Sequence, residues 1–132
     1  MKKQDVLFTS EQMRGSGQSD MVALINQNED RKALLRITPH NFFSDPGHGW
    51  LQVCHEDLKI LGILGAISEC SYRMEGAVYL EEDMDATTYI SALFTPYAER
   101  TVEDHSAFKM WRDQIKGFNS NSDSFIRNLN HL

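Results

Sequence analysis

The chain has 132 residues, which is the size of one domain built around a single hydrophobic core. Its net charge of −6 and its pI of about 5.3 argue against binding to nucleic-acid phosphates and favour solubility, a basic partner or mimicry of nucleic acid. No apolar run approaches the ~20 residues of a membrane helix, and no secretory segment follows Met1, so we expect a cytoplasmic protein.

The N-terminal part of the chain predicts two strands and a helix. Residues 1–18 are mixed, with a short strand at Val6–Phe8 and a Gly/Ser-rich loop that we expect to be flexible. Ser19 or Asp20 is predicted to cap the helix that follows. The apolar run Ala33–Ile37 predicts the second strand.

The central stretch, residues 42–94, begins with the strongest turn signal in the chain. In Asp45-Pro46-Gly47-His48-Gly49, proline presets φ and the glycines allow positive φ, so a tight turn is predicted. A strand is predicted at Trp50–Val53, where alternation puts Trp50 and Leu51 on opposite faces.

A helix and a hairpin are predicted next. Glu56 and Asp57 open the helix, and Gly62 weakens and stops it. Ile67–Arg73 and Ala77–Glu81 predict two strands joined by a short loop that contains glycine.

Two further helices are predicted. Asp85 is the expected N-cap of the first, and Thr101–Asp104 is a capping box that opens the second. The second helix places four apolar residues on one face, namely Phe108, Trp111, Ile115 and Phe118. This face either completes the monomer core or packs against a second copy in a homodimer, and both alternatives stay open.

These elements predict an α+β fold in a single domain of residues 1–132. A small antiparallel sheet with a central hairpin is flanked by helices, and residues 119–132 form a tail. The two cysteines, Cys54 and Cys70, lack the spacing of a zinc site and are expected to be reduced and buried.

Two groups of side chains are candidates for binding. In the turn, Asp45, His48 and Trp50 form a loop tip carried by a strand, although backbone shape alone is a sufficient reason for the glycines there. The acidic run of Glu81, Glu82 and Asp83 could hold a cation, or could simply end a strand before a helix. Because no metal-site spacing, nucleotide-binding motif or hydrolase motif is present, we predict no metal, no cofactor and no catalytic residue.

Several segments taken together resemble one family. They are FFSDPGHGWLQV, a following LGI, ISECSY, VYLEEDMDATTYISAL and the ending Ser124–Asn128. This combination resembles a family of small uncharacterised proteins carried by bacteriophages and other mobile elements. The resemblance implies an accessory protein in the cytoplasm of a bacterial host, and such proteins often bind a host protein, for example one of an antiviral defence system.

Two functions are therefore weighed, and the sequence favours the first. The first is a non-enzymatic binding module for a host protein, with its binding residues spread over a flat face. The second is a small nucleotide- or metal-binding enzyme or sequestering protein, in which the carboxylates bind Mg²⁺, His48 is a general base or phosphate partner, and Arg73 and Arg127 hold anionic oxygens. Only the second function requires these residues to line one concave pocket.

Overall fold

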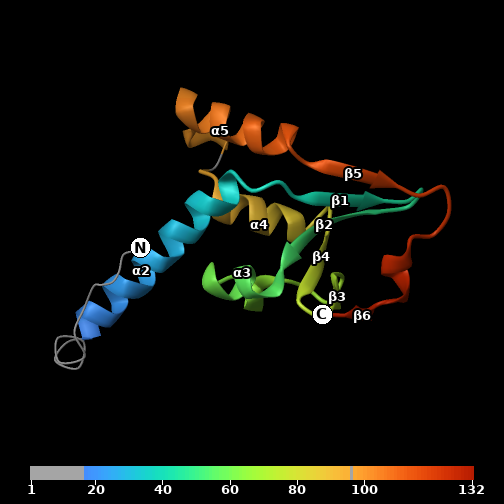
Figure 1. Cartoon of the computed structure of the whole chain (residues 1–132), viewed down its shortest axis with the longest axis horizontal. Helices are drawn as coiled ribbons and strands as arrows, with labels where there is room; N and C mark the ends of the chain where they lie inside the picture. Colours follow the sequence, from blue (N-terminus) through green and yellow to red (C-terminus); the bar gives the residue numbers. More distant parts are fainter. Residues whose placement is uncertain (1–16, 96) are drawn as a thin grey trace.

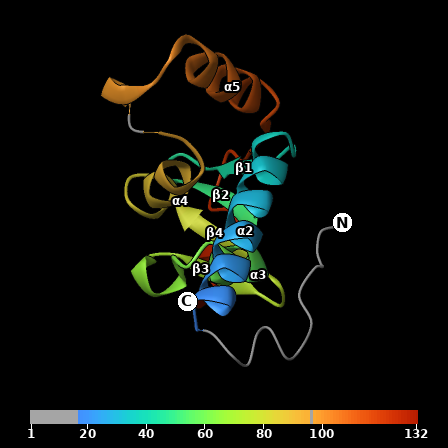
Figure 2. The same ribbon diagram turned by 90° about the vertical axis from the view of Figure 1, so that its left-hand side faces the viewer.

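A computed structural model describes residues 17–95 and 97–132, so the predicted strand at Val6–Phe8 lies outside the described residues. The described strands form one six-stranded sheet in the order β5-β1-β2-β4-β3-β6, and the helices pack on one of its faces (Figure 1, Figure 2). Neighbouring strands are antiparallel except β1 and β5, which are parallel. The predicted α+β class with a mainly antiparallel sheet is confirmed.

The described part begins with the long helix α2 (Gly17–Arg36), whose N-terminal end extends away from the sheet (Figure 1). The strand predicted at Ala33–Ile37 is wrong, because residues 33–36 continue this helix and Leu35 reaches the core from it. Alanine, leucine and arginine are strong helix formers, which explains the outcome. The predicted cap at Ser19 or Asp20 is also wrong, since the helix already includes Gly17.

The predicted turn joins a hairpin of β1 (Asn41–Ser44) and β2 (Gly49–Cys54). Neither glycine of the turn has a positive φ, so the reason given for them from the sequence is wrong. What both require is space: a Cβ at Gly49 would overlap the Phe42 ring. The sequence pattern predicted β2 but not β1.

The next elements are α3 (His55–Ile60), the 3-10 turn Leu64–Ala66, β3 (Tyr72–Met74) and β4 (Ala77–Glu81). The predicted helix, its stop at Gly62 with φ of 75° and the hairpin are confirmed. The first hairpin strand is shorter than predicted, because residues 67–71 form a loop.

The C-terminal half contains α4 (Asp85–Leu93), the 3-10 turn Tyr97–Glu99, α5 (Val102–Asp113), β5 (Lys116–Asn119), the 3-10 turn Phe125–Asn128 and β6 (Asn130–His131). The capping box that opens α5 is confirmed. The predicted helix face is too long, however, because α5 ends at Asp113 and Phe118 lies in β5.

The sheet separates two apolar clusters. Leu51 and Leu80 face the helices, where they pack with residues such as Tyr89 and Trp111. On the opposite face, Trp50 packs with residues such as Tyr79 and Ile126 in a smaller cluster. The predicted alternation along β2 is confirmed. Both cysteines are free, and both are exposed rather than buried as predicted.

Candidate functional site

The Asp45 carboxylate joins the β1–β2 turn to the C-terminal segment. Its Oδ1 accepts hydrogen bonds from the Gly47 and His48 backbone N–H groups, each at 3.0 Å, which closes the turn. Its Oδ2 accepts one from the Ser124 N–H at 3.1 Å. Arg127 donates from Nε at 2.7 Å and from Nη2 at 2.8 Å. The Asp45 side chain is fully buried by these partners.

Arg127 stabilises the charged form of Asp45. The two donated hydrogen bonds from the guanidinium hold the pKa of Asp45 far below its ordinary value, and the three backbone N–H groups lower it further. A Cβ at Gly47 would lie 2.8 Å from Arg127 Nη2, so a larger residue there would require this guanidinium to shift from its position on Asp45. Thus two segments about 80 residues apart in the sequence form one unit.

Beside this unit lies a pocket of about 380 Å³, which we call the turn pocket. Its wall is formed by the turn, the start of β2, β3 with the loop before it, the end of β4 with the residues after it, and the C-terminal segment. Most of the surface that lines it is apolar. The residues that line it are His48, Trp50, Cys70, Tyr72, Glu81, Asp83, Met84, Arg127 and His131.

Trp50 is the most deeply buried residue of the wall, with 2% of its surface exposed. The Tyr72 ring meets it edge-on at 6.2 Å between centroids, and Arg127 Cζ lies 5.5 Å from its ring centroid. The indole Nε1–H is buried without a hydrogen-bond partner among the described residues. An unsatisfied buried donor of this kind costs free energy.

Glu81 and Asp83 supply the negative charge of the wall. Glu81 Oε1 accepts from the backbone N–H groups of Asp83 at 3.0 Å and Met84 at 3.1 Å, which fixes the chain after β4. Glu81 Oε2 lies 3.9 Å from His48 Nδ1, beyond hydrogen-bond range. The Asp83 carboxylate is exposed and has no hydrogen bond or ion pair within the described part of the chain.

Asp85 lies behind the pocket and does not cap α4, contrary to the prediction. Met84 is the N-cap residue, and the buried Asp85 carboxylate accepts hydrogen bonds from Ser68 and Ser71. The Ser71 hydroxyl accepts in turn from the Glu81 N–H at 3.0 Å. This network holds residues 67–71 as a loop and so positions Cys70 beside the pocket.

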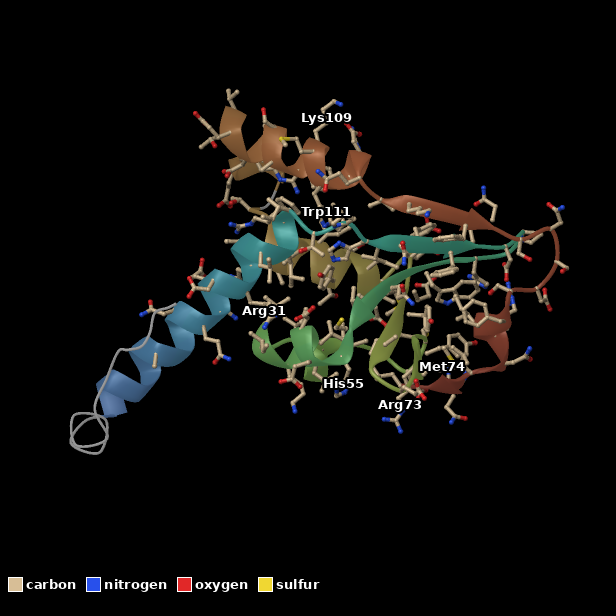
Figure 3. All side chains as sticks on the ribbon, viewed as in Figure 1. Arg31, His55, Arg73, Met74, Lys109 and Trp111 are labelled. Carbon is tan, nitrogen blue, oxygen red and sulfur yellow. The ribbon has the colours of Figure 1, made fainter. Side chains whose placement is uncertain are left out.

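The structure brings together five of the eight binding residues predicted from the sequence: His48, Trp50, Glu81, Asp83 and Arg127. Asp45 positions Arg127 from behind the wall. Glu82 is exposed and lies outside the lining. Arg73 lies at the β3–β4 hairpin with Met74 and lines a different hollow (Figure 3).

Sequence reasoning missed four residues of the wall: Cys70, Tyr72, Met84 and His131. His131 reaches the pocket because β6 pairs with β3, which places its ring 4.4 Å from the Tyr72 ring. No local pattern marks a two-residue strand that pairs with another strand some 58 residues away, so no sequence signal was available for His131.

Two negative findings concern the described residues. Among them, no three His, Cys, Asp or Glu side chains lie where they could hold a metal ion together. No helix in residues 17–95 or 97–132 is long and apolar enough to cross a membrane.

Comparison with protein-family models, with curated proteins and with solved structures finds no match to this chain.

Proposed function

We propose that the protein is a non-enzymatic binding protein that takes its ligand in the turn pocket. The observation that carries the proposal is convergence: residues from the turn, from the three strands β2, β3 and β4, and from the C-terminal segment line one concave space. A pocket with apolar walls and a few convergent polar groups is the usual form of a ligand site.

A concave pocket was the arrangement expected for the second function weighed from the sequence, and a flat face the one expected for the first. The convergence of these residues therefore favours a site for a small ligand or an inserted side chain over a flat binding face, although Arg73 lies outside the pocket. A catalytic use of the same residues has less support. A general base needs a hydrogen-bonded partner that orients it, but the ring of His48 makes no hydrogen bond within the described part of the chain.

The resemblance to proteins of bacteriophages and mobile elements directs the search for the ligand to a bacterial host. The ligand is then either a small molecule of the host cytoplasm or a side chain that a host protein, such as a defence protein, inserts into the pocket. Both would occupy a space of about 380 Å³, which is within the usual range for ligand pockets.

The two tryptophans allow a direct test, because they lie in opposite apolar clusters. The indole N–H signals of ¹⁵N-labelled protein are recorded by NMR after addition of a bacterial lysate that ultrafiltration has divided into small molecules and macromolecules. We expect one fraction to shift the Trp50 signal and to leave the Trp111 signal in place.

Two exposed methionines provide a matched pair of variants. Met84 lines the pocket and is 54% exposed, whereas Met110 is 62% exposed on α5 and does not line it. Met84→Arg is expected to abolish the Trp50 shift, and Met110→Arg to preserve it. The proposal is wrong if neither fraction moves the Trp50 signal, or if both variants respond as the wild type does.

A further inference from the structure

We infer that the turn pocket accepts an organic cation, an ammonium or guanidinium group on a short apolar stem. This inference rests on the proposed function and adds the chemical class of the ligand. It follows from the charges and the rings that line the pocket.

The charges of the wall favour a cation. Asp83 has no partner in the described part of the chain, and Glu81 Oε2 has only His48 near it, at 3.9 Å. Arg127 does not balance these carboxylates, because the buried Asp45 already binds its guanidinium at two atoms and Asp123 lies 3.7 Å from its Nε. The wall thus presents net negative charge to a ligand, and an anion would be repelled.

The rings of the wall act in the same direction. Tyr72 and His131 present aromatic surface, and Tyr72 lies between His131 and the buried Trp50. A cation over an indole or phenol face is attracted by the ring quadrupole, and the attraction grows when the cation is desolvated. The apolar stem of such a ligand would contact the rings and Met84, while its charge reaches the carboxylates.

A cation of this kind can come from two sources. It is either a free organic amine or a lysine or arginine side chain of a protein. Two probes distinguish them: n-butylammonium, and Nα-acetyl-lysine N-methylamide, which presents the same charge on a peptide backbone. Butanol and butyrate are the neutral and anionic controls of similar size. Each is titrated into ¹⁵N-labelled wild-type protein while the Trp50 and Trp111 indole signals are followed.

We expect both cations to shift the Trp50 signal in a saturable way that weakens as salt is added, and Trp111 to stay unchanged. Asp83→Asn should weaken cation binding about tenfold, because it removes one charge-assisted contact without changing the shape of the side chain. Glu82→Gln is the matched control, since it removes the same charge from the adjacent residue, outside the lining. It should leave the affinity almost unchanged.

A shift by the lysine amide alone would also support the inference and would identify a protein side chain as the source. Butanol or butyrate binding as tightly as the cations would overturn it, and so would an affinity unchanged by Asp83→Asn. Either of these results would leave the pocket as a binding site. If a lysate fraction shifts Trp50 but no cation does, the inference is wrong and the proposed function stands. If neither shifts it, both are wrong.

Discussion

Among single residues, Asp45 contributes most to the site although it does not line the pocket. Its carboxylate receives hydrogen bonds from both the turn and the C-terminal segment, and its side chain is fully buried. Removal of one partner from a buried, hydrogen-bonded ion pair leaves the other uncompensated. Asp45 is therefore a positioning residue, and its substitution should disturb the pocket.

We predict that Asp45→Asn lowers the midpoint of urea unfolding and moves the Trp50 indole signal. Asp123→Asn is the matched control, because Asp123 lies 3.7 Å from the same guanidinium but its side chain is 85% exposed. Asp123→Asn should leave both the urea midpoint and the Trp50 indole signal almost unchanged. Since the pKa of Asp45 is lowered in the fold, the stability it gives is present above its ordinary value of 3.8 and is lost as the pH falls below that value. Equal effects of the two variants, or the same acid sensitivity in Asp45→Asn and wild type, would contradict this role.

The stability of the fold is also expected to depend on pH through His40, which lies on the helix side of the sheet. Its Nδ1 lies 2.7 Å from the Thr38 carbonyl oxygen and 3.2 Å from the Trp111 indole Nε1, and its Nε2 lies 2.7 Å from the Tyr89 hydroxyl, which can donate or accept. Burial lowers the pKa of His40 below its ordinary 6.5, although the Thr38 carbonyl and Asp57 oppose this. The unfolded chain therefore binds the proton more readily than the folded one.

Stability should consequently be complete above pH 6.5 and should fall as the pH decreases from there. The slope of the unfolding free energy approaches about 1.4 kcal/mol per pH unit at most. Urea unfolding at a series of pH values measures it, and His40→Gln should remove this component of the slope. A variant with an unchanged slope would show that His40 is not its source.

Among the elements, helix α5 begins at a capping box and carries a tryptophan into the core. Thr101 Oγ1 accepts from the Asp104 N–H and Asp104 Oδ2 accepts from the Thr101 N–H, both at 3.1 Å. The helix that begins there carries the buried Trp111 into the main cluster (Figure 3).

Thr101→Ala should therefore cost about 1 kcal/mol of unfolding free energy, because the helix loses its cap. Ser106→Ala, in the same helix at an exposed position, is expected to cost almost nothing. Chemical denaturation of both variants measures the difference. Equal stabilities would mean that the capping box is not needed to hold α5.

How far each element could be predicted depends on the range of the interactions that form it. Local signals were sufficient for the turn at Asp45, the stop at Gly62, the strand β4 and the cap at Thr101. Strands β5 and β6 were missed because they are short and pair only with distant segments, and β1 was missed although it pairs with β2 across the predicted turn. Asp85 was placed wrongly because its partners lie 14 and 17 residues earlier in the chain.

For the whole molecule, the predicted helix face takes part in the core of a single chain. Trp111 is 2% exposed and packs in the main cluster with residues such as Phe94. Trp111→Ala should therefore cost about 3–5 kcal/mol, as is usual for large-to-small changes in a core. Met110→Ala, at the exposed neighbouring position, should change stability little when both are measured by urea unfolding. A Trp111→Ala protein as stable as the wild type would contradict the packing.

A homodimer stays a prediction, and the burial of Trp111 changes how it is tested. Substitution of Trp111 would report on folding rather than on assembly, so the mass of the wild-type protein is the informative measurement. Light scattering at micromolar concentration gives that mass directly. A dimer mass would require a contact surface other than the Trp111 side chain.

The site could be predicted in part because its residues belong to recognisable turn and acidic segments. What the sequence could not give was their convergence, which depends on the C-terminal segment crossing the second face of the sheet and binding Asp45 through Arg127 (Figure 1). The pocket therefore forms only when segments distant in the sequence pack together, whereas the sequence identified its residues separately in each segment.

The most direct test of the account is to locate the bound cation. An isotope-filtered NOE spectrum of labelled protein with unlabelled n-butylammonium reports which rings lie next to its methylene protons. We predict contacts with Trp50 and Tyr72, and none with Phe118 or Phe125, which line a separate aromatic hollow beside β5. Contacts with Phe118 and Phe125 in place of the turn-pocket rings, or with no ring at all, would contradict the account.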